Sequence, residues 1–163
     1  MTRNKIIRIV FILLGVGILI VGGIGLYIFN MPHRDVTSTK ADYQLKASEI
    51  VSEYLKDAVK ANDKYLDSEG ESKILEVSGL IASISTDFND QKVILLKDEN
   101  ANAGVTCTFT KETNSLVADL KVGQEVSIKG VIRSGASYDE DLEMYENVIL
   151  DKCSLINNKF KNN

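Results

Sequence analysis

The chain is poor in several residue types on which catalytic sites depend. Its 163 residues include one proline, one histidine, two cysteines and no tryptophan. His33 has no second histidine with which to share a metal ion. No recognisable motif pairs His33 with either cysteine, so the sequence offers no activated thiol nucleophile. The sequence also contains no glycine-rich phosphate loop and no serine-centred elbow. We therefore expect no metal, no cofactor and no enzymatic activity.

Positive charge is scarce through most of the chain. The first 29 residues contain Arg3, Lys5 and Arg8 and no acidic residue, so the rest holds 16 basic residues against 23 acidic ones. Non-specific affinity for nucleic acid comes mainly from Lys and Arg that displace counterions from phosphates. The composition makes nucleic acid an unexpected partner without excluding it.

Charge is missing altogether from residues 9–29. This run of 21 residues is rich in Ile, Val, Leu and Gly, and as a helix it would be roughly 30 Å long, the thickness of a bilayer's hydrocarbon core. The basic residues precede it, which assigns residues 1–8 to the cytoplasm. We predict a single-pass helix in the bacterial cytoplasmic membrane, with lipid contacts through residues 9–29 and the C-terminal domain on the extracytoplasmic side.

A cleaved signal peptide is the main alternative for this segment. Signal peptides have an apolar stretch of about 7–15 residues and a cleavage site of small side chains. Here the run is longer and closes on Leu26, Tyr27, Ile28 and Phe29. We favour an uncleaved anchor.

The part of the chain after the anchor divides into four segments. Residues 30–45 are expected to form a polar linker. Residues 46–67 repeat apolar positions at steps of three and four, which predicts one amphipathic helix packed on a larger body. Residues 72–157 are expected to form a β domain, and residues 158–163 a short tail.

Within the β domain the period changes to two. Strands are predicted at residues 74–84, 92–97, 105–109, 125–132 and 147–155, with a short helix at 115–120 and an acidic loop at 139–143. Three strands, a short helix and two strands is the order of an OB-fold, a five-stranded Greek-key barrel. The expected fold is mainly β with helices: this barrel, preceded by one amphipathic helix and the transmembrane helix.

Several short blocks match one family. They are Ala61–Tyr65 with its Ala-x-x-x-Tyr spacing, Leu75–Gly79, Val105–Phe109, Leu120–Gly130 with Gly-x-x-Val-x-x-x-Gly, and Cys153–Leu155. In this order they resemble the bacterial tRNA-anticodon-binding-like OB-fold family, over roughly 110 residues. The resemblance implies an OB barrel and, by the family's name, binding of nucleic acid.

The ligand face of an OB barrel usually lies on its second and third strands. In this chain those strands offer Lys92, Lys97, Thr106 and Thr108 as candidates for ligand contact, and Phe109 shares the phase of the core positions. A face without aromatic platforms favours a protein, peptide or oligosaccharide. Nucleic acid remains the alternative that the family name implies. An unidentified protein or envelope component is the expected partner.

Cys107 and Cys153 fall on the third and fifth predicted strands, which neighbour each other in an OB barrel. In an oxidising compartment they could form a disulfide. They could equally be two small buried side chains, since free cysteine is commonly buried. Both interpretations stay open at this point.

Overall fold

The structure is a computed structural model that describes residues 17, 20–24, 36–68 and 72–156. The chain divides into two compact units, residues 1–35 and residues 36–163. In the first unit the described residues are helical. No helix among the described residues has both the length and the apolar character needed to cross a membrane. The predictions for residues 1–8, for most of 9–29, for 30–35 and for the tail 158–163 lie outside the described residues.

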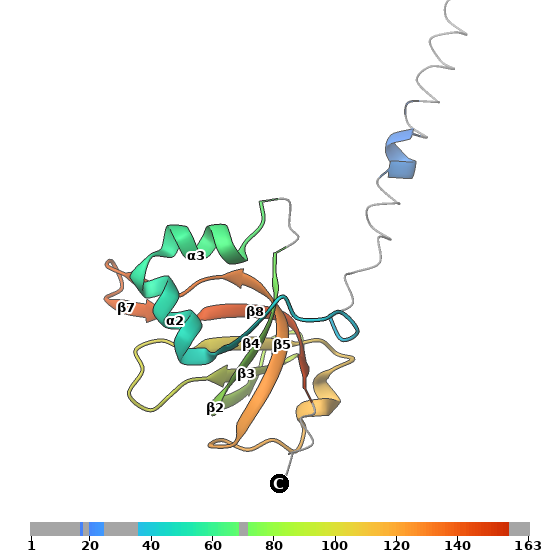
Figure 1. The fold of residues 1–163 in the computed structure, drawn as a ribbon. Helices are drawn as coiled ribbons and strands as arrows, with labels where there is room; N and C mark the ends of the chain where they lie inside the picture. Colours follow the sequence, from blue (N-terminus) through green and yellow to red (C-terminus); the bar gives the residue numbers. More distant parts are fainter. Residues whose placement is uncertain (1–16, 18–19, 25–35, 69–71, 157–163) are drawn as a thin grey trace, which may run out of the picture. The chain divides into compact units, whose positions relative to one another are not determined.

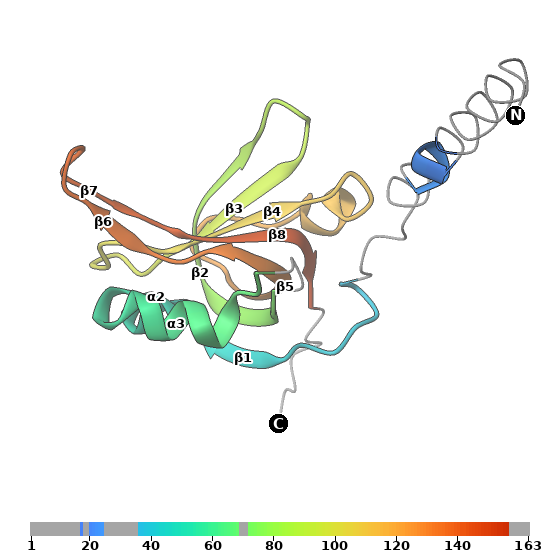
Figure 2. The ribbon, with the colours of Figure 1, turned by 90° about the horizontal axis from the view of Figure 1, so that it is seen from above.

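The second unit is built on a closed barrel of five strands, whose arrangement is shown in Figures 1 and 2. Around the barrel the strands follow the order β2, β3, β4, β8, β5, and β5 pairs again with β2. All neighbours are antiparallel except β4 and β8, which run parallel. This is the OB-fold topology expected from the order of the elements. The strands are β2 (Ile74–Thr86), β3 (Lys92–Leu96), β4 (Val105–Phe109), β5 (Glu125–Ser134) and β8 (Val148–Leu155).

Alternation of apolar and polar residues explains why these segments form a barrel. In β4 the side chains of Val105, Cys107 and Phe109 are fully buried, while Thr106 and Thr108 point outward. Successive side chains of a strand point to opposite faces, so one apolar residue in two is enough to fill the interior. Burial of each such side chain stabilises the fold by about 1.5–3 kcal/mol before entropy is counted.

The single amphipathic helix expected at 46–67 is two helices, α2 (Ala47–Lys56) and α3 (Ala58–Tyr65). The break is at Asp57, whose backbone is not helical and whose carboxylate accepts a hydrogen bond from the backbone N–H of Lys60 at 3.0 Å. Asp caps a helix N-terminus better than it fits a helix interior. Most of the apolar stripe predicted from the sequence is nevertheless buried on the barrel, at Ala47, Ile50, Val51, Tyr54, Ala61 and Tyr65. Its other members, Leu55, Ala58 and Asn62, are exposed.

The described part of the expected linker, residues 36–45, is packed against the barrel and is no free spacer. Val36 is buried, and β1 (Tyr43–Lys46) pairs in parallel with the first half of β2. The buried Lys129 of β5 donates hydrogen bonds from Nζ to the carbonyls of Thr37 and Thr39, at 2.9 and 2.7 Å. A buried ammonium needs such partners because desolvation of an unpaired charge is costly.

The acidic loop expected at 139–143 is the tip of a hairpin. Its strands are β6 (Ser137–Asp139) and β7 (Met144–Glu146), which form a two-stranded sheet of their own. Figure 2 shows this hairpin projecting from the barrel as an arm. The short helix expected at 115–120 is a single turn of 3-10 helix, η1 (Asn114–Val117).

Cys107 and Cys153 are fully buried on the paired strands β4 and β8, and both are free thiols. Burial raises the pKa of the Cys153 thiol, and the neighbouring Cys107 adds to the rise. A Cβ at Gly130 would lie only 2.6 Å from the sulfur of Cys153, so glycine is what leaves room for this side chain. Protonated, buried thiols are poor nucleophiles. In this structure the two cysteines are small buried side chains, and the disulfide that an oxidising compartment would allow remains a hypothesis.

Candidate functional site

The register of the barrel brings one set of small polar and aliphatic side chains to its exterior. Thr106 of β4 lies between Leu95 of β3 and Ile149 of β8, and Leu95 is paired on its other side with Ser83 of β2. A second row runs beside the first, from Ser85 through Val93 to Thr108. We call this surface the outer face. Its members are Ser83, Ser85, Val93, Leu95, Thr106, Thr108 and Ile149.

Two of the four ligand-contact candidates, Thr106 and Thr108, lie on the outer face, each partly exposed. Thr106 Oγ1 accepts a hydrogen bond from the amide of Asn147 at 3.3 Å, and the carbonyl oxygen of that amide accepts one from the backbone N–H of Gly104 at 2.8 Å. Asn147 therefore fixes the start of β8 against β4, and it orients the Thr106 hydroxyl.

The two lysine candidates do not converge on this surface. Lys92 shares the phase of the buried Ile94, and its Nζ donates to the hydroxyl of Thr86 at 3.0 Å. Lys97 follows the other end of β3, and its Nζ donates to the carbonyl of Asn102 at 3.3 Å. They are five residue steps apart along the strand, so their backbones are separated by roughly 16 Å. They form no basic cluster with each other.

Sequence reasoning missed five members of the outer face, which are Ser83, Ser85, Val93, Leu95 and Ile149. Their alternation is visible in the sequence, but their place beside Thr106 and Thr108 depends on strand register. In β2 the register shifts between Ile81 and Ser83. A bulge of this kind changes the face of the sheet to which the following side chains point. The sequence alone does not show at which residue the bulge occurs.

An ion pair lies beside the outer face, where β5 meets β8. The guanidinium Nε of Arg133 is 2.9 Å from a carboxylate oxygen of Asp151. Because each of these two charges has an opposite partner, the Arg133–Asp151 pair adds no net positive charge that would attract phosphates. The outer face itself has only hydroxyl and aliphatic side chains.

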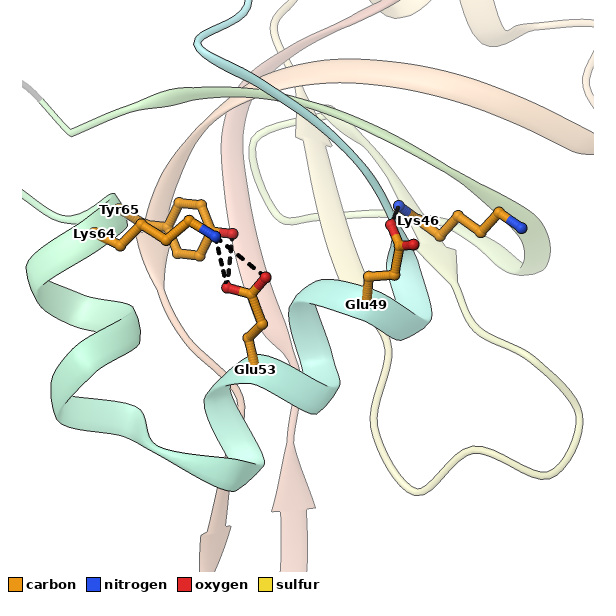
Figure 3. A network of polar contacts seen from close by, with 5 residues as sticks. All are labelled: Lys46, Glu49, Glu53, Lys64 and Tyr65. Carbon is orange, nitrogen blue, oxygen red and sulfur yellow. Dashed lines mark hydrogen bonds and ion pairs between the residues drawn. The ribbon is translucent and has the colours of Figure 1, made fainter.

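A second polar cluster joins α2, α3 and β1 (Figure 3). Glu53 accepts hydrogen bonds from Lys64 Nζ at 2.9 Å and from the Tyr65 hydroxyl at 2.9 Å. The Lys64 ammonium also lies over the rings of Tyr65 and Tyr43, 4.6 and 5.3 Å from their centres. Cation–π contacts and charged hydrogen bonds of this kind hold elements together.

The protonation states of this cluster suit a structural role. Contact with Tyr65, followed by the bond to Glu53, raises the pKa of the Lys64 ammonium. The hydrogen bond from Lys64 lowers the pKa of the Glu53 carboxyl, against an opposing effect of burial. A lysine that acts as a base or a nucleophile needs a lowered pKa instead. Lys64 and Glu53 are therefore held as a charged pair.

Two adjoining depressions flank β1, and Gln44 and Glu49 line both. Their carboxylates already have protein partners. Glu49 accepts from the backbone N–H of Lys46 at 2.7 Å (Figure 3), and Glu76 accepts from the amide of Gln44 and the hydroxyl of Ser127, each at 3.0 Å. These contacts attach β1 and α2 to the barrel. Among the described residues no group of acidic, histidine or cysteine side chains is arranged to hold a metal ion.

Comparison with known proteins gives one family and a similar fold. The family model described as tRNA_anti-like matches residues 1–141. A crystal structure of a lipoprotein from Klebsiella pneumoniae subsp. pneumoniae, for which nucleic-acid binding is suggested, is 17% identical with a TM-score of 0.51. It covers 77% of this chain and 99% of its own. OBody NL8 bound to hen egg-white lysozyme is 20% identical with a TM-score of 0.36, over 52% of this chain and 94% of its own. No curated protein matches the chain.

Proposed function

The chain belongs to the tRNA_anti-like family, and we propose that it is a non-catalytic binding module of the bacterial cell envelope. In this proposal an N-terminal helix, residues 9–29, anchors the chain in the cytoplasmic membrane. The OB barrel lies on the extracytoplasmic side and recognises a protein, a peptide or an oligosaccharide. The family match confirms the resemblance identified from the sequence blocks. The proposal concerns the ligand, its location and the lack of catalysis.

The chemistry of the outer face is the observation that carries the proposal. Hydroxyls at Ser83, Ser85 and Thr108 alternate with aliphatic side chains at Leu95 and Ile149, on the strands where OB-folds bind their ligands. Hydroxyls can donate and accept hydrogen bonds, and the aliphatic groups offer apolar contact. Such a surface suits a polypeptide backbone or a sugar.

Binding of nucleic acid is the alternative, and the family name and the suggestion made for the Klebsiella lipoprotein support it. The side chains of the outer face suit nucleic acid less well than they suit a protein, a peptide or an oligosaccharide. Single strands are bound by stacking on aromatic rings inside a positively charged groove. The outer face has no aromatic member, Lys92 and Lys97 are apart, and Arg133 is paired with Asp151.

Site-specific crosslinking of the full chain in its native membrane tests the proposed face. A photoreactive residue is placed at Thr106, with a second variant carrying it at Lys60, an exposed position of α3. We expect Thr106 to yield a defined adduct with a protein or a glycan and Lys60 to yield none. Adducts with nucleic acid alone, or no adduct at Thr106, would refute the proposed function.

The proposed location is tested separately. Single-cysteine reporters on the surface of the barrel, read with a reagent that does not cross membranes, should be labelled in intact spheroplasts. Protection of these reporters until the cells are lysed would place the domain in the cytoplasm and contradict this part of the proposal.

A further inference from the structure

The hairpin β6–β7 exposes more apolar surface than its size explains. The exposed fractions are 49% for Tyr138, 67% for Leu142, 52% for Met144 and 37% for Tyr145. A short two-stranded hairpin is marginally stable by itself, and apolar side chains normally stabilise it by packing on a core. Here they face solvent on an arm that projects from the barrel (Figure 2). Clustered exposed apolar groups mark interaction surfaces.

The two tyrosines lie on one face of the hairpin, and Met144, which is paired with Asp139, points to the other face. Tyr138 and Tyr145 are directly opposite each other in the register, and their ring centres are 4.8 Å apart with a tilt of 56°. A cross-strand aromatic pair stabilises a hairpin. The electron-rich faces of tyrosine rings also attract lysine and arginine side chains.

The charge of the arm has a single sign. Between Arg133 and Lys152 the sequence has no basic residue, whereas acidic residues stand at 139, 140, 141, 143, 146 and 151. Asp139 is used within the hairpin, where its carboxylate accepts from the backbone N–H groups of Asp141 and Leu142. Glu140 and Asp141 are exposed at the tip.

The base of the arm is fixed, which gives this surface a defined position. Residues 135 and 136 connect β5 to β6, and Ala136 is buried in the core. The ring of Tyr54 in α2 lies against Gly135 so closely that a Cβ there would be 1.9 Å from Cε1. A surface presented on a fixed base loses less conformational entropy on binding.

We propose that the hairpin β6–β7 is a docking arm for a basic polypeptide segment of a partner protein, with lysine or arginine side chains over the Tyr138–Tyr145 pair and against the tip carboxylates. Both features of the arm select the same chemistry, because aromatic faces and carboxylates each attract cations. This inference rests on the proposed function, that the domain is a binding module. It adds a second surface and the class of partner.

The same features make other ligands less suitable. Nucleic acid would be repelled by the acidic tip. A neutral sugar could stack on a tyrosine ring, but it would gain nothing from an arm in which every charge is negative. The combination of exposed apolar groups with uniform negative charge is complementary to a segment that carries both apolar and basic residues.

Photocrosslinking combined with charge reversal tests the arm in the full chain in its native membrane. The photoreactive residue replaces Tyr138, and in a matched control it replaces Phe88, an exposed aromatic residue at the β2–β3 turn. The test variant carries Glu140→Lys and Asp141→Lys. Its control, Asp98→Lys with Glu99→Lys, makes the same change of net charge at another exposed turn.

We expect an adduct at Tyr138 with a protein whose crosslinked peptide contains lysine or arginine beside apolar residues, and none at Phe88. The Glu140→Lys, Asp141→Lys variant should lower its yield by about tenfold, and the control pair should leave it unchanged. An adduct with a glycan, nucleic acid or an acidic peptide would overturn the proposal. An adduct yield at Tyr138 that is unchanged in the Glu140→Lys, Asp141→Lys variant would overturn it as well. Failure at Tyr138 with an adduct at Thr106 rejects the arm alone, whereas failure at Thr106 rejects the proposed function.

Discussion

Tyr54 and Gly135 are in close contact across the boundary between α2 and the docking arm. The ring occupies the space that a side chain at residue 135 would need, with Cε1 and Cδ1 at 1.9 and 2.0 Å from the position of a Cβ. Tyr54 is itself buried, and its ring stacks on Tyr65 at 6.1 Å. The contact therefore links the helix pair, the barrel core and the base of the hairpin.

The first prediction concerns Gly135→Ala. Because the ring of Tyr54 is buried and lies where the Cβ would be placed, the added methyl group must displace the ring, α2 or the chain at 135. We expect the free energy of unfolding to fall by about 1–3 kcal/mol, as for other overpacked sites. Chemical denaturation measures it, with Ser85→Ala on the exposed side of β2 as control. An unchanged midpoint would show that the close contact does not exist in solution.

The second prediction concerns the hydroxyl of Tyr54, which has no hydrogen-bond partner among the described residues. Burial raises the pKa of this group to about 12. A buried unsatisfied hydroxyl costs about 1–3 kcal/mol, so Tyr54→Phe should be at least as stable as the natural chain. Tyr65→Phe is the matched control, because that hydroxyl donates to Glu53, and it should lose about 1 kcal/mol. A destabilised Tyr54→Phe variant would mean that the hydroxyl is in fact bonded.

The third prediction concerns pH. Glu53 has a pKa lowered from 4.5 in the folded chain, so its ionised form stabilises the fold above that value, and the contribution is lost as pH falls through the folded pKa. Side-chain exposure of 40% for Glu53 and 36% for Lys64 limits the effect to about 0.2–1 kcal/mol.

Glu53→Gln should therefore be less stable than the natural chain at neutral pH, and the difference should shrink in acid. Denaturation midpoints at several pH values measure this, with Glu99→Gln as the exposed control. A difference that grows in acid would contradict the pairing with Lys64.

The fourth prediction concerns the thiols. Cys107 and Cys153 are buried and free in the structure, so alkylation of the native chain should be slow, and denaturation without reductant should expose two reactive thiols. Mass spectrometry counts them. Finding no alkylated cysteine until reductant is added would show the disulfide that an oxidising compartment could form, and would contradict the free-thiol state.

Much of the barrel could be predicted from the sequence because its strands alternate. Val105, Cys107 and Phe109 point inward in strict alternation with two threonines, and this pattern has one interpretation. The four-residue β1 alternates too, with Tyr43 and Leu45 partly buried. Four residues are too few for this pattern to identify a strand, and its place is set by its pairing with β2. The break at Asp57 was missed because the apolar stripe continues across it.

The candidate surfaces were less predictable than the fold. Thr106 and Thr108 could be assigned to the exterior from their phase. The contribution of Ser83 depends on a register shift in β2, which is a property of strand pairing. The hairpin was expected as a loop because each of its strands has only three residues, too few to show a strand pattern in the sequence. The contact between the rings of Tyr138 and Tyr145, which identifies the two segments as paired strands, is seen only in the structure.

The direct test of the central claim, that this OB barrel is a binding module for ligands other than nucleic acid, is a mobility-shift titration. The full chain in detergent is titrated against single-stranded DNA and against transfer RNA at low salt, where phosphate binding is strongest. We predict no shift with either. A shift that weakens steeply as salt is added would contradict the claim and establish nucleic acid as the ligand.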